Sequence, residues 1–147
     1  MNRSIIRHGF FLILAALVSG LFISAMRIPR LGLSAHTIGL LSGILLIALG
    51  AIWRQFSLSP RQEAVMYWSW LYSSWVNWLG CLIGAVLGAG RMTPVAAAGV
   101  VASPSAESLV AFLLMSVALL SFVAVGLSLW GLRSRAAPHT AAGDPEP

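Results

Sequence analysis

Long apolar stretches alternate with short segments that carry the polar residues, glycines and prolines. The apolar stretches occupy about residues 9–26, 34–53, 62–87 and 107–132. A helix of about 20 residues crosses the ~30 Å hydrocarbon core of a bilayer, and each stretch is close to that length. The pattern predicts an all-α, integral membrane four-helix bundle that forms one domain, residues 1–135.

Two helix starts can be located in the sequence. Ser59 is followed by Pro60 and, three residues on, by Gln62, and Ser103 is followed by Pro104. A capping serine before a proline is typical of the first turn of a helix. We therefore expect the third and fourth helices to begin near these prolines.

The segments outside the helices give less information. Segment 88–102, between the third and fourth stretches, is rich in glycine and alanine and could be a lid or only a connector. The tail 136–147 is rich in alanine, proline and glycine, and we expect it to be disordered cytoplasmic chain. The N-terminal stretch follows Arg3 and Arg7, as in a cleavable signal peptide, but it is longer than the apolar part of most signal peptides. We interpret it as a helix of the mature protein.

Composition and charge support the membrane assignment. Hydrophobic residues make up 59% of the 147 residues and charged residues 9%, and the mean hydropathy is +0.89. These values exclude an ordinary soluble domain. The net charge of +5 comes from arginines alone, and they lie at the ends of the stretches, which favours lipid headgroups over nucleic acid.

The arginines also predict an orientation, because positive charge is retained on the cytoplasmic side. One end of the bundle would carry Arg3, Arg7, Arg54, Arg61, Arg133 and Arg135, and the other Arg27, Arg30 and Arg91. This asymmetry places both termini in the cytoplasm, with the protein in a bacterial-type inner (plasma) membrane. Cys81 is the only cysteine, so an internal disulfide and a cysteine-pair metal site are excluded.

The third stretch has a small, polar side. Residues on it recur at spacings of three and four: Ser69, Ser73, Asn77, Gly80, Cys81, Gly84 and Gly88. The glycines could simply allow close helix packing. Asn77 is a stronger functional candidate, because an amide within the membrane must find a hydrogen-bond partner. The other sides carry Trp68, Trp70, Trp75 and Trp78, which we expect to face lipid or a partner subunit.

His36 is the candidate ligand of the second stretch. It shares a narrow arc with Gly39, Gly43 and Gly50, and these small residues would leave room for a flat or bulky group. Asn77 lies roughly 20 Å from the cytoplasmic end of its helix, near the expected level of His36. We therefore expect both residues to border one cavity. A neutral imidazole there could bind haem iron, or His36 could be an ordinary hydrogen-bonded packing residue.

Several reaction classes are disfavoured. No acidic residue lies in the middle of any stretch, which argues against a proton pump or cation-coupled carrier that uses a buried carboxylate. A constellation of serine, histidine and acid is also absent from the sequence.

The sequence resembles the hydroxylaminobenzene mutases over about residues 7–133. The resemblance lies in the run Pro29-Arg30-Leu31-Gly32-Leu33-Ser34-Ala35-His36, then Gly43, Trp53, Leu58-Ser59-Pro60-Arg61, Asn77-Trp78 and the loop Gly88-Ala89-Gly90-Arg91-Met92-Thr93-Pro94-Val95-Ala96-Ala97. It implies an isomerase that converts an aryl hydroxylamine to the 2-aminophenol by moving the hydroxyl from nitrogen to the ring.

The sequence is more distantly similar to the styrene oxide isomerases, through Ala35-His36 and the glycine at Gly43. This similarity implies a homotrimer with ferric haem b, His36 as the axial iron ligand and Asn77 as a residue that orients the substrate. Three pocket positions depart from those isomerases and carry Ser42, Ser73 and Cys81, so we predict that these residues border an aryl hydroxylamine instead of an epoxide. Arg27, Arg30 and Arg91 could pair with haem propionates or act as interfacial anchors.

Two alternatives remain open. One is an epoxide-to-aldehyde isomerase of the same architecture. The other is a non-enzymatic small membrane carrier or packing subunit, since stripes of small residues suit either role.

Overall fold

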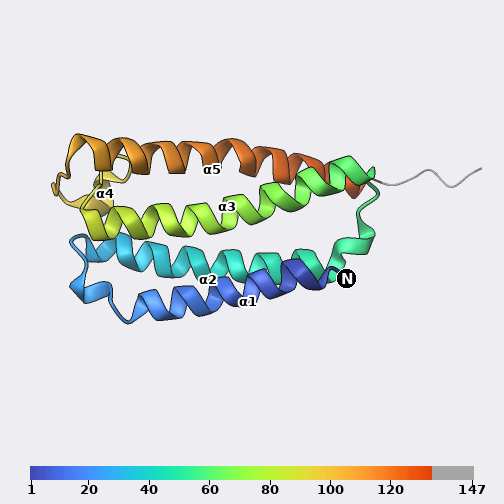
Figure 1. Ribbon diagram of the computed structural model, residues 1–147, viewed down its shortest axis with the longest axis horizontal. Coiled ribbons are helices and arrows are strands. Elements are labelled where there is room, and N and C mark those ends of the chain that lie inside the picture. The colour runs from blue at the N-terminus through green and yellow to red at the C-terminus, as the bar shows by residue number, and fades with distance from the viewer. Residues whose placement is uncertain (134–147) are drawn as a thin grey trace, which may run out of the picture.

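The computed structural model describes residues 1–133 and contains four long helices (Figure 1). Each long helix runs antiparallel to the one before it in the chain. They are α1 (Arg3–Gly20), α2 (Pro29–Ile52), α3 (Pro60–Leu87) and α5 (Pro104–Gly131), and the short α4 (Pro94–Ala97) lies between α3 and α5. Single 3-10 turns follow α1 (Ile23–Ala25) and α2 (Trp53–Gln55). The predicted disordered tail, 136–147, and Arg135 lie outside the described residues.

The predicted all-α membrane fold is confirmed, because the four long helices are long and apolar enough to cross a membrane. Their bounds differ from the hydropathy pattern at the first two helices. Helix α1 begins at Arg3, where the Asn2 side chain accepts hydrogen bonds from the N–H groups of Ser4 and Ile5, and it ends at Gly20. Helix α2 begins at Pro29, ahead of the predicted residue 34. His36 therefore lies in the second turn of its helix.

The predicted starts of α3 and α5 are confirmed. The Ser59 hydroxyl accepts from the Gln62 N–H, and the Gln62 side chain accepts from the Ser59 N–H, which forms a capping box. The Ser103 hydroxyl accepts from the Ala106 N–H. Each bond satisfies a backbone donor that the first helical turn leaves free.

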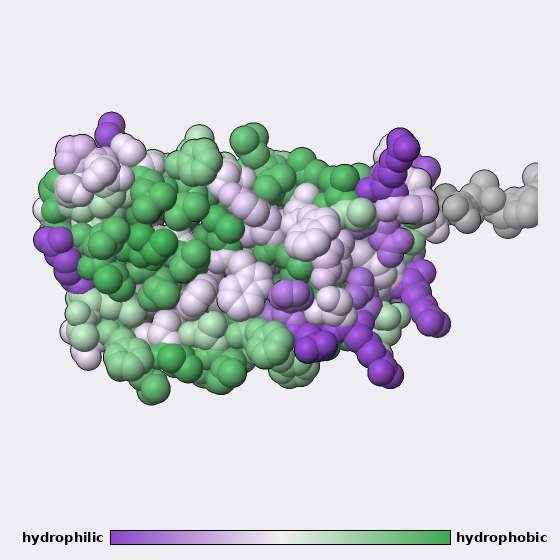
Figure 2. All heavy atoms as spheres, in the orientation of Figure 1, coloured by the Kyte–Doolittle hydropathy of each residue, from purple (hydrophilic) through white to green (hydrophobic). Residues whose placement is uncertain are grey.

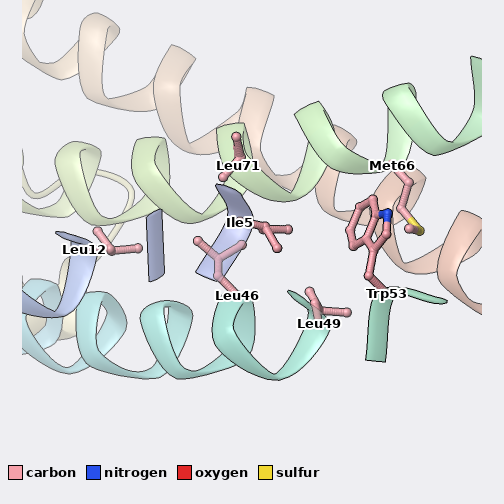
Figure 3. Packing of buried hydrophobic residues seen from close by; sticks show 7 residues of the cluster. All are labelled: Ile5, Leu12, Leu46, Leu49, Trp53, Met66 and Leu71. Atoms are coloured by element: carbon pink, nitrogen blue, oxygen red, sulfur yellow. The ribbon is translucent and has the colours of Figure 1, made fainter. Parts of the chain in front are cut away.

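The helices form a row in which α1 packs along α2, α2 along α3 and α3 along α5 (Figure 1), and α1 also contacts α3 directly. The core between them includes Ile5, Leu12, Leu46, Leu49, Trp53, Met66 and Leu71 (Figure 3). Large hydrophobic side chains also cover much of the outer surface (Figure 2). Helix α5, at one edge of the row, exposes the most of them, among others Phe112, Leu119 and Phe122. Such a surface suits lipid or a second subunit.

The glycines of α2 bring this helix into close contact with α1. A Cβ atom at Gly43 would lie 2.7 Å from the Gly9 carbonyl oxygen and 2.5 Å from Ile13 Cγ1, and one at Gly39 would lie 2.6 Å from Ala16 Cβ. The prediction that these glycines leave room for a flat or bulky group is therefore wrong for this chain. Helix α1 and, at Gly39, the Trp78 ring fill that room.

The segment between α3 and α5 is fastened by one carboxylate. Glu107 is buried, and its side chain accepts hydrogen bonds from the N–H groups of Gly90 at 3.2 Å, Arg91 at 3.0 Å and Ala102 at 3.4 Å. Arg27 donates to the Leu87 carbonyl at 2.8 Å, at the end of α3. These bonds favour the connector over the lid among the two alternatives for this segment.

Replacing Gly43 with alanine should separate α1 from α2. The new methyl group would meet the backbone of α1, which cannot rotate away, and such overpacking costs about 1–3 kcal/mol. We expect a lower midpoint of thermal unfolding in detergent. Gly126→Ala is the matched control, because nothing lies within 4 Å of a Cβ at that position. Equal midpoints for the two variants would contradict the proposed close contact.

Glu107→Ala should release segment 88–102. The substitution leaves three backbone N–H groups without their acceptor, at a cost of about 1–3 kcal/mol for each one that stays buried. We expect faster proteolysis within this segment than in the unmodified protein. Glu107→Gln, which keeps one side-chain acceptor oxygen, should show an intermediate rate. An unchanged cleavage rate in the alanine variant would show that the Glu107 carboxylate does not hold this segment in place.

Candidate functional site

His36 points toward α1 and is half-buried. Its Nδ1 atom lies 2.7 Å from the carbonyl oxygen of Ala16. A carbonyl oxygen only accepts hydrogen bonds, so Nδ1 must carry the proton and donate it. In the neutral ring the lone pair is then on Nε2. This nitrogen makes no hydrogen bond within residues 1–133, and it is therefore the atom of His36 available for chemistry.

The last turn of α1 surrounds the acceptor of this bond. The Ser19 hydroxyl donates to the same Ala16 carbonyl at 2.9 Å, and Ser19 is buried. Gly20 leaves the space that the imidazole occupies, because a Cβ there would lie 2.6 Å from His36 Nδ1 and 2.9 Å from Cε1. The ring thus sits against backbone rather than against side chains of α1.

The structure places His36 and Asn77 near the same level, as the sequence predicted. A Cβ at Gly39, one turn after His36, would lie 2.7 Å from the Trp78 ring, and Trp78 is the neighbour of Asn77. The predicted common cavity is not formed by this chain alone. His36 faces α1, whereas its neighbour Ala35 packs on the other side of α2 in a cluster with Cys81 of α3.

The other predicted site residues lie on the α2 and α3 sides of the bundle. Asn77 is half-buried and makes no hydrogen bond within the described part of the chain. The Ser73 hydroxyl, one turn earlier, is fully buried and also lacks a partner there. Ser42 is half-buried, one turn before the core residue Leu46. Cys81 is enclosed by apolar side chains, so its position is explained by packing.

Ser73 and Asn77 are therefore two polar side chains of α3 that have no hydrogen-bond partner among the described residues. A buried polar group without a hydrogen bond is costly, and the cost is greatest within a membrane. Their spacing of four residues places both on one side of the helix. This side can accept a polar ligand or the polar surface of a second subunit.

One large cavity among the described residues was not predicted. It is an open apolar groove of about 770 Å³ between α1 and α3, lined by His8, Phe11, Ser19, Phe22, Trp75 and Trp78 among others, but by neither His36 nor Asn77. The indole N–H groups of Trp75 and Trp78 are buried and unpartnered within residues 1–133. The sequence signal was the pair of tryptophans itself, which their position away from the small, polar side of the helix led us to assign to lipid or to a partner subunit.

Only part of that tryptophan assignment is correct. Trp68 is 67% exposed, as expected. Trp70 instead donates to the Ser128 hydroxyl of α5 at 3.0 Å, and Trp75 packs edge-to-face against His8 of α1. Of the outer arginines, Arg27 already has a partner in the chain, the Leu87 carbonyl.

The described residues contain no group of three or more histidine, cysteine, aspartate or glutamate side chains that could hold a metal ion together. Residues 1–133 thus do not form a metal centre with several protein ligands. Haem differs, because its porphyrin supplies four of the iron ligands and the protein can supply a single imidazole. Of the two histidines in residues 1–133, His36 is the one whose Nδ1 atom bonds a backbone carbonyl, which leaves Nε2 without a hydrogen bond there.

Comparisons with known proteins identify the family of this chain. The chain is 39% identical to hydroxylaminobenzene mutase HabB of Ectopseudomonas oleovorans over 91% of this chain and 82% of that protein. It is 33% identical to hydroxylaminobenzene mutase HabA of the same organism over 90% of this chain and 98% of that protein. No solved structure is significantly similar. A family model described as styrene oxide isomerase matches residues 1–133. Both predicted resemblances and the prediction of an isomerase are confirmed, and the chain belongs to the styrene oxide isomerase family.

Proposed function

We propose that this protein is a membrane-bound hydroxyl transferase that converts hydroxylaminobenzene, or a close aryl hydroxylamine, to the 2-aminophenol. The observation that carries the proposal is the identity of 39% and 33% with two hydroxylaminobenzene mutases over about nine-tenths of the chain. Membership of an isomerase family argues against the non-enzymatic carrier or packing subunit.

We further propose that His36 holds ferric haem b through Nε2. The support is the hydrogen bond from Nδ1 to the Ala16 carbonyl, because histidines that bind metals commonly donate their other ring N–H to such a backbone acceptor. When bound, the haem would supply a Lewis acid. Gly39 and Gly43 no longer belong to the proposed cofactor site, since α1 and Trp78 fill the space beside them.

The reaction is an isomerisation, so atoms balance without an oxidant or reductant. The N–O bond breaks, a C–O bond forms at the ring carbon next to the nitrogen-bearing carbon, and the proton lost from that carbon is balanced by one gained at nitrogen. The protein must hold the aromatic ring and the hydroxyl together, keep bulk water out and stabilise positive charge on the ring.

Residues of this chain can supply these functions. Asn77 and Ser73, whose polar groups lack partners, would hydrogen-bond the hydroxylamine, and Ser42 remains a candidate beside them. Trp75 and Trp78 line the apolar groove, and their indole N–H groups have no partner within the described residues. Their ring faces could stabilise the positive charge that develops on the substrate. We keep Cys81 as a packing neighbour of this region rather than a reacting group.

We propose a homotrimer, as the resemblance to the styrene oxide isomerases implies. His36 bonds α1, and the buried Ser73 hydroxyl of α3 has no partner within the described residues, so a second subunit could complete a site that one chain leaves open. The exposed apolar sides of the row are available for such contacts. The mass of the protein in detergent, measured by light scattering, tests the subunit number.

We propose that both termini face the cytoplasm of a bacterial-type inner membrane. In the described chain, the end of the row where α1 begins carries Arg3, Arg7, Arg54, Arg61 and Arg133, and the opposite end carries Arg27, Arg30 and Arg91. The more positive end is retained inside. A reporter enzyme that is active only in the cytoplasm, fused after the last residue, tests this orientation.

The first test is turnover of hydroxylaminobenzene by the purified protein, with styrene oxide as a second substrate. We expect 2-aminophenol from the first and no aldehyde from the second, because the chain carries Ser42, Ser73 and Cys81 at the positions where the resemblance implies an epoxide pocket. Phenylacetaldehyde as the main product would replace the mutase with the epoxide isomerase. Turnover in labelled water should leave the label out of the product if the hydroxyl transfers within the molecule.

The absorption spectrum of the same protein tests the cofactor. We expect a Soret band in the unmodified protein and its loss, together with activity, in His36→Ala. His8→Ala is the matched control, because it removes a histidine that is not the proposed ligand. An active protein without the band would exclude haem from the reaction, and a band that persists in His36→Ala would assign the iron to another ligand.

Asn77→Leu should lower kcat by about 10- to 100-fold, because the substrate would lose a group that orients it. Leu79→Ala is the matched control on the same helix, since Leu79 is 41% exposed. Equal activity of the Asn77 variant and the unmodified protein would remove Asn77 from the site.

A further inference from the structure

The last turn of α1 contacts His36 in a way that the family assignment does not specify. We propose that Gly20 and the Ala16 carbonyl, supported by Ser19, are positioning groups that fix the orientation and tautomer of the His36 imidazole. The proposal deepens the proposed function and depends on it only in assigning chemistry to Nε2.

The first step of the argument is the acceptor. The Ala16 carbonyl oxygen lies 2.7 Å from His36 Nδ1, a short distance for a hydrogen bond that involves nitrogen. A hydroxyl or carboxylate could rotate away or change its protonation state, but this backbone oxygen does neither. It can form a hydrogen bond with the imidazole only if Nδ1 carries the hydrogen, and it therefore selects the tautomer with the lone pair on Nε2.

The second step is the space beside the ring. Most glycines that face the α1–α2 contact lie against backbone or aliphatic atoms of the other helix, as Gly9 does against the Gly43 carbonyl and Ile47. Gly20 differs, because its nearest atoms are Nδ1 and Cε1 of His36. A methyl group there would push the ring off the carbonyl. Glycine at this position thus allows the hydrogen bond to form.

The third step is the support of the acceptor. The Ser19 hydroxyl donates to the Ala16 carbonyl at 2.9 Å from within the same turn, and Ser19 is 8% exposed. Two side-chain donors, Ser19 from α1 and His36 from α2, thus bond the Ala16 carbonyl oxygen. The serine holds the turn in the conformation that points this carbonyl at α2, and without it the acceptor could tilt.

The test is magnetic resonance of isotope-labelled histidine in the full chain, in detergent at alkaline pH, where an ordinary imidazole is neutral. His8→Gln and His139→Gln leave His36 as the only histidine in the background protein. Haem that copurifies is removed before the measurement, because an imidazole bound to iron through Nε2 carries its proton on Nδ1 whatever its other contacts are. We expect the proton on Nδ1 in the unmodified site, and its partial or complete loss from Nδ1 in Gly20→Ala.

Gly9→Ala is the matched control. Its Cβ would also lie 2.6 Å from an atom of α2, so it disturbs the same helix pair, but it lies far along α1 from His36. We expect this variant to keep the Nδ1 proton. Ser19→Ala is a milder variant for use if Gly20→Ala does not fold, and it should weaken the Nδ1–H signal without abolishing it.

Activity is measured on the matching variants in the chain that keeps His8 and His139, without removal of any bound haem. Loss of a group that orients a metal-binding histidine lowers activity by about 10- to 100-fold, and we expect a fall of that size in Gly20→Ala but not in Gly9→Ala. A proton on Nε2 in the unmodified site, an unchanged tautomer in both Gly20→Ala and Ser19→Ala, or the same change in Gly9→Ala would each overturn the positioning role. An unmodified protein with the expected tautomer but no mutase activity would instead overturn the proposed function alone.

Discussion

The close contact of α1 with α2 is the constraint on which the rest of the structure depends. Glycines on both helices let the two backbones approach so closely that a Cβ atom would clash. At Gly43, for example, a Cβ atom would lie 2.7 Å from the Gly9 carbonyl oxygen. In a bilayer the hydrophobic effect does not drive helices together, so such van der Waals contact and a few hydrogen bonds must do so. One of these bonds, from the Asn2 N–H to the Gly50 carbonyl, joins the pair at the end where α1 begins. The bond from His36 to Ala16 joins it near the other end.

This arrangement ties the chemistry to the packing. His36 obtains its hydrogen bond from α1, while the polar groups at Ser73 and Asn77 lie on α3. Helix α1 packs mainly along α2 and also contacts α3 directly, so these two sets of groups belong to different helix contacts. The open groove between α1 and α3 is lined by neither His36 nor Asn77. The proposed assembly of several chains would offer a way to bring these groups together.

Much of the fold could be predicted from the sequence. Hydropathy identified the four membrane-length helices, and the serine-proline pairs gave the starts of α3 and α5. The start of α1 was misplaced because its first turn is polar and capped by Asn2, and hydropathy marks only the apolar part of a helix. The start of α2 was misplaced for a related reason, since its first turn carries Arg30.

The site was harder to predict. Helical spacing correctly grouped His36 with Gly39 and Gly43, and it gave the level of Asn77. It could not tell whether a glycine makes room for a ligand or for another helix, because both demand the absence of a side chain. Spacing also gives only the side of one helix, so the contact of His36 with α1 and the burial of Trp78 against Gly39 required the arrangement of the helices.

The acceptor of His36 is a main-chain oxygen, and this has a consequence for how the protein can vary. No single substitution can remove a peptide carbonyl, so the tautomer of the imidazole is protected from direct mutation at Ala16. The same feature makes it sensitive to changes elsewhere, because only the register of α1 along α2 keeps the carbonyl in place. Natural variants with lost or altered activity should therefore concentrate along the contact between these helices, at residues that never touch the reacting molecule.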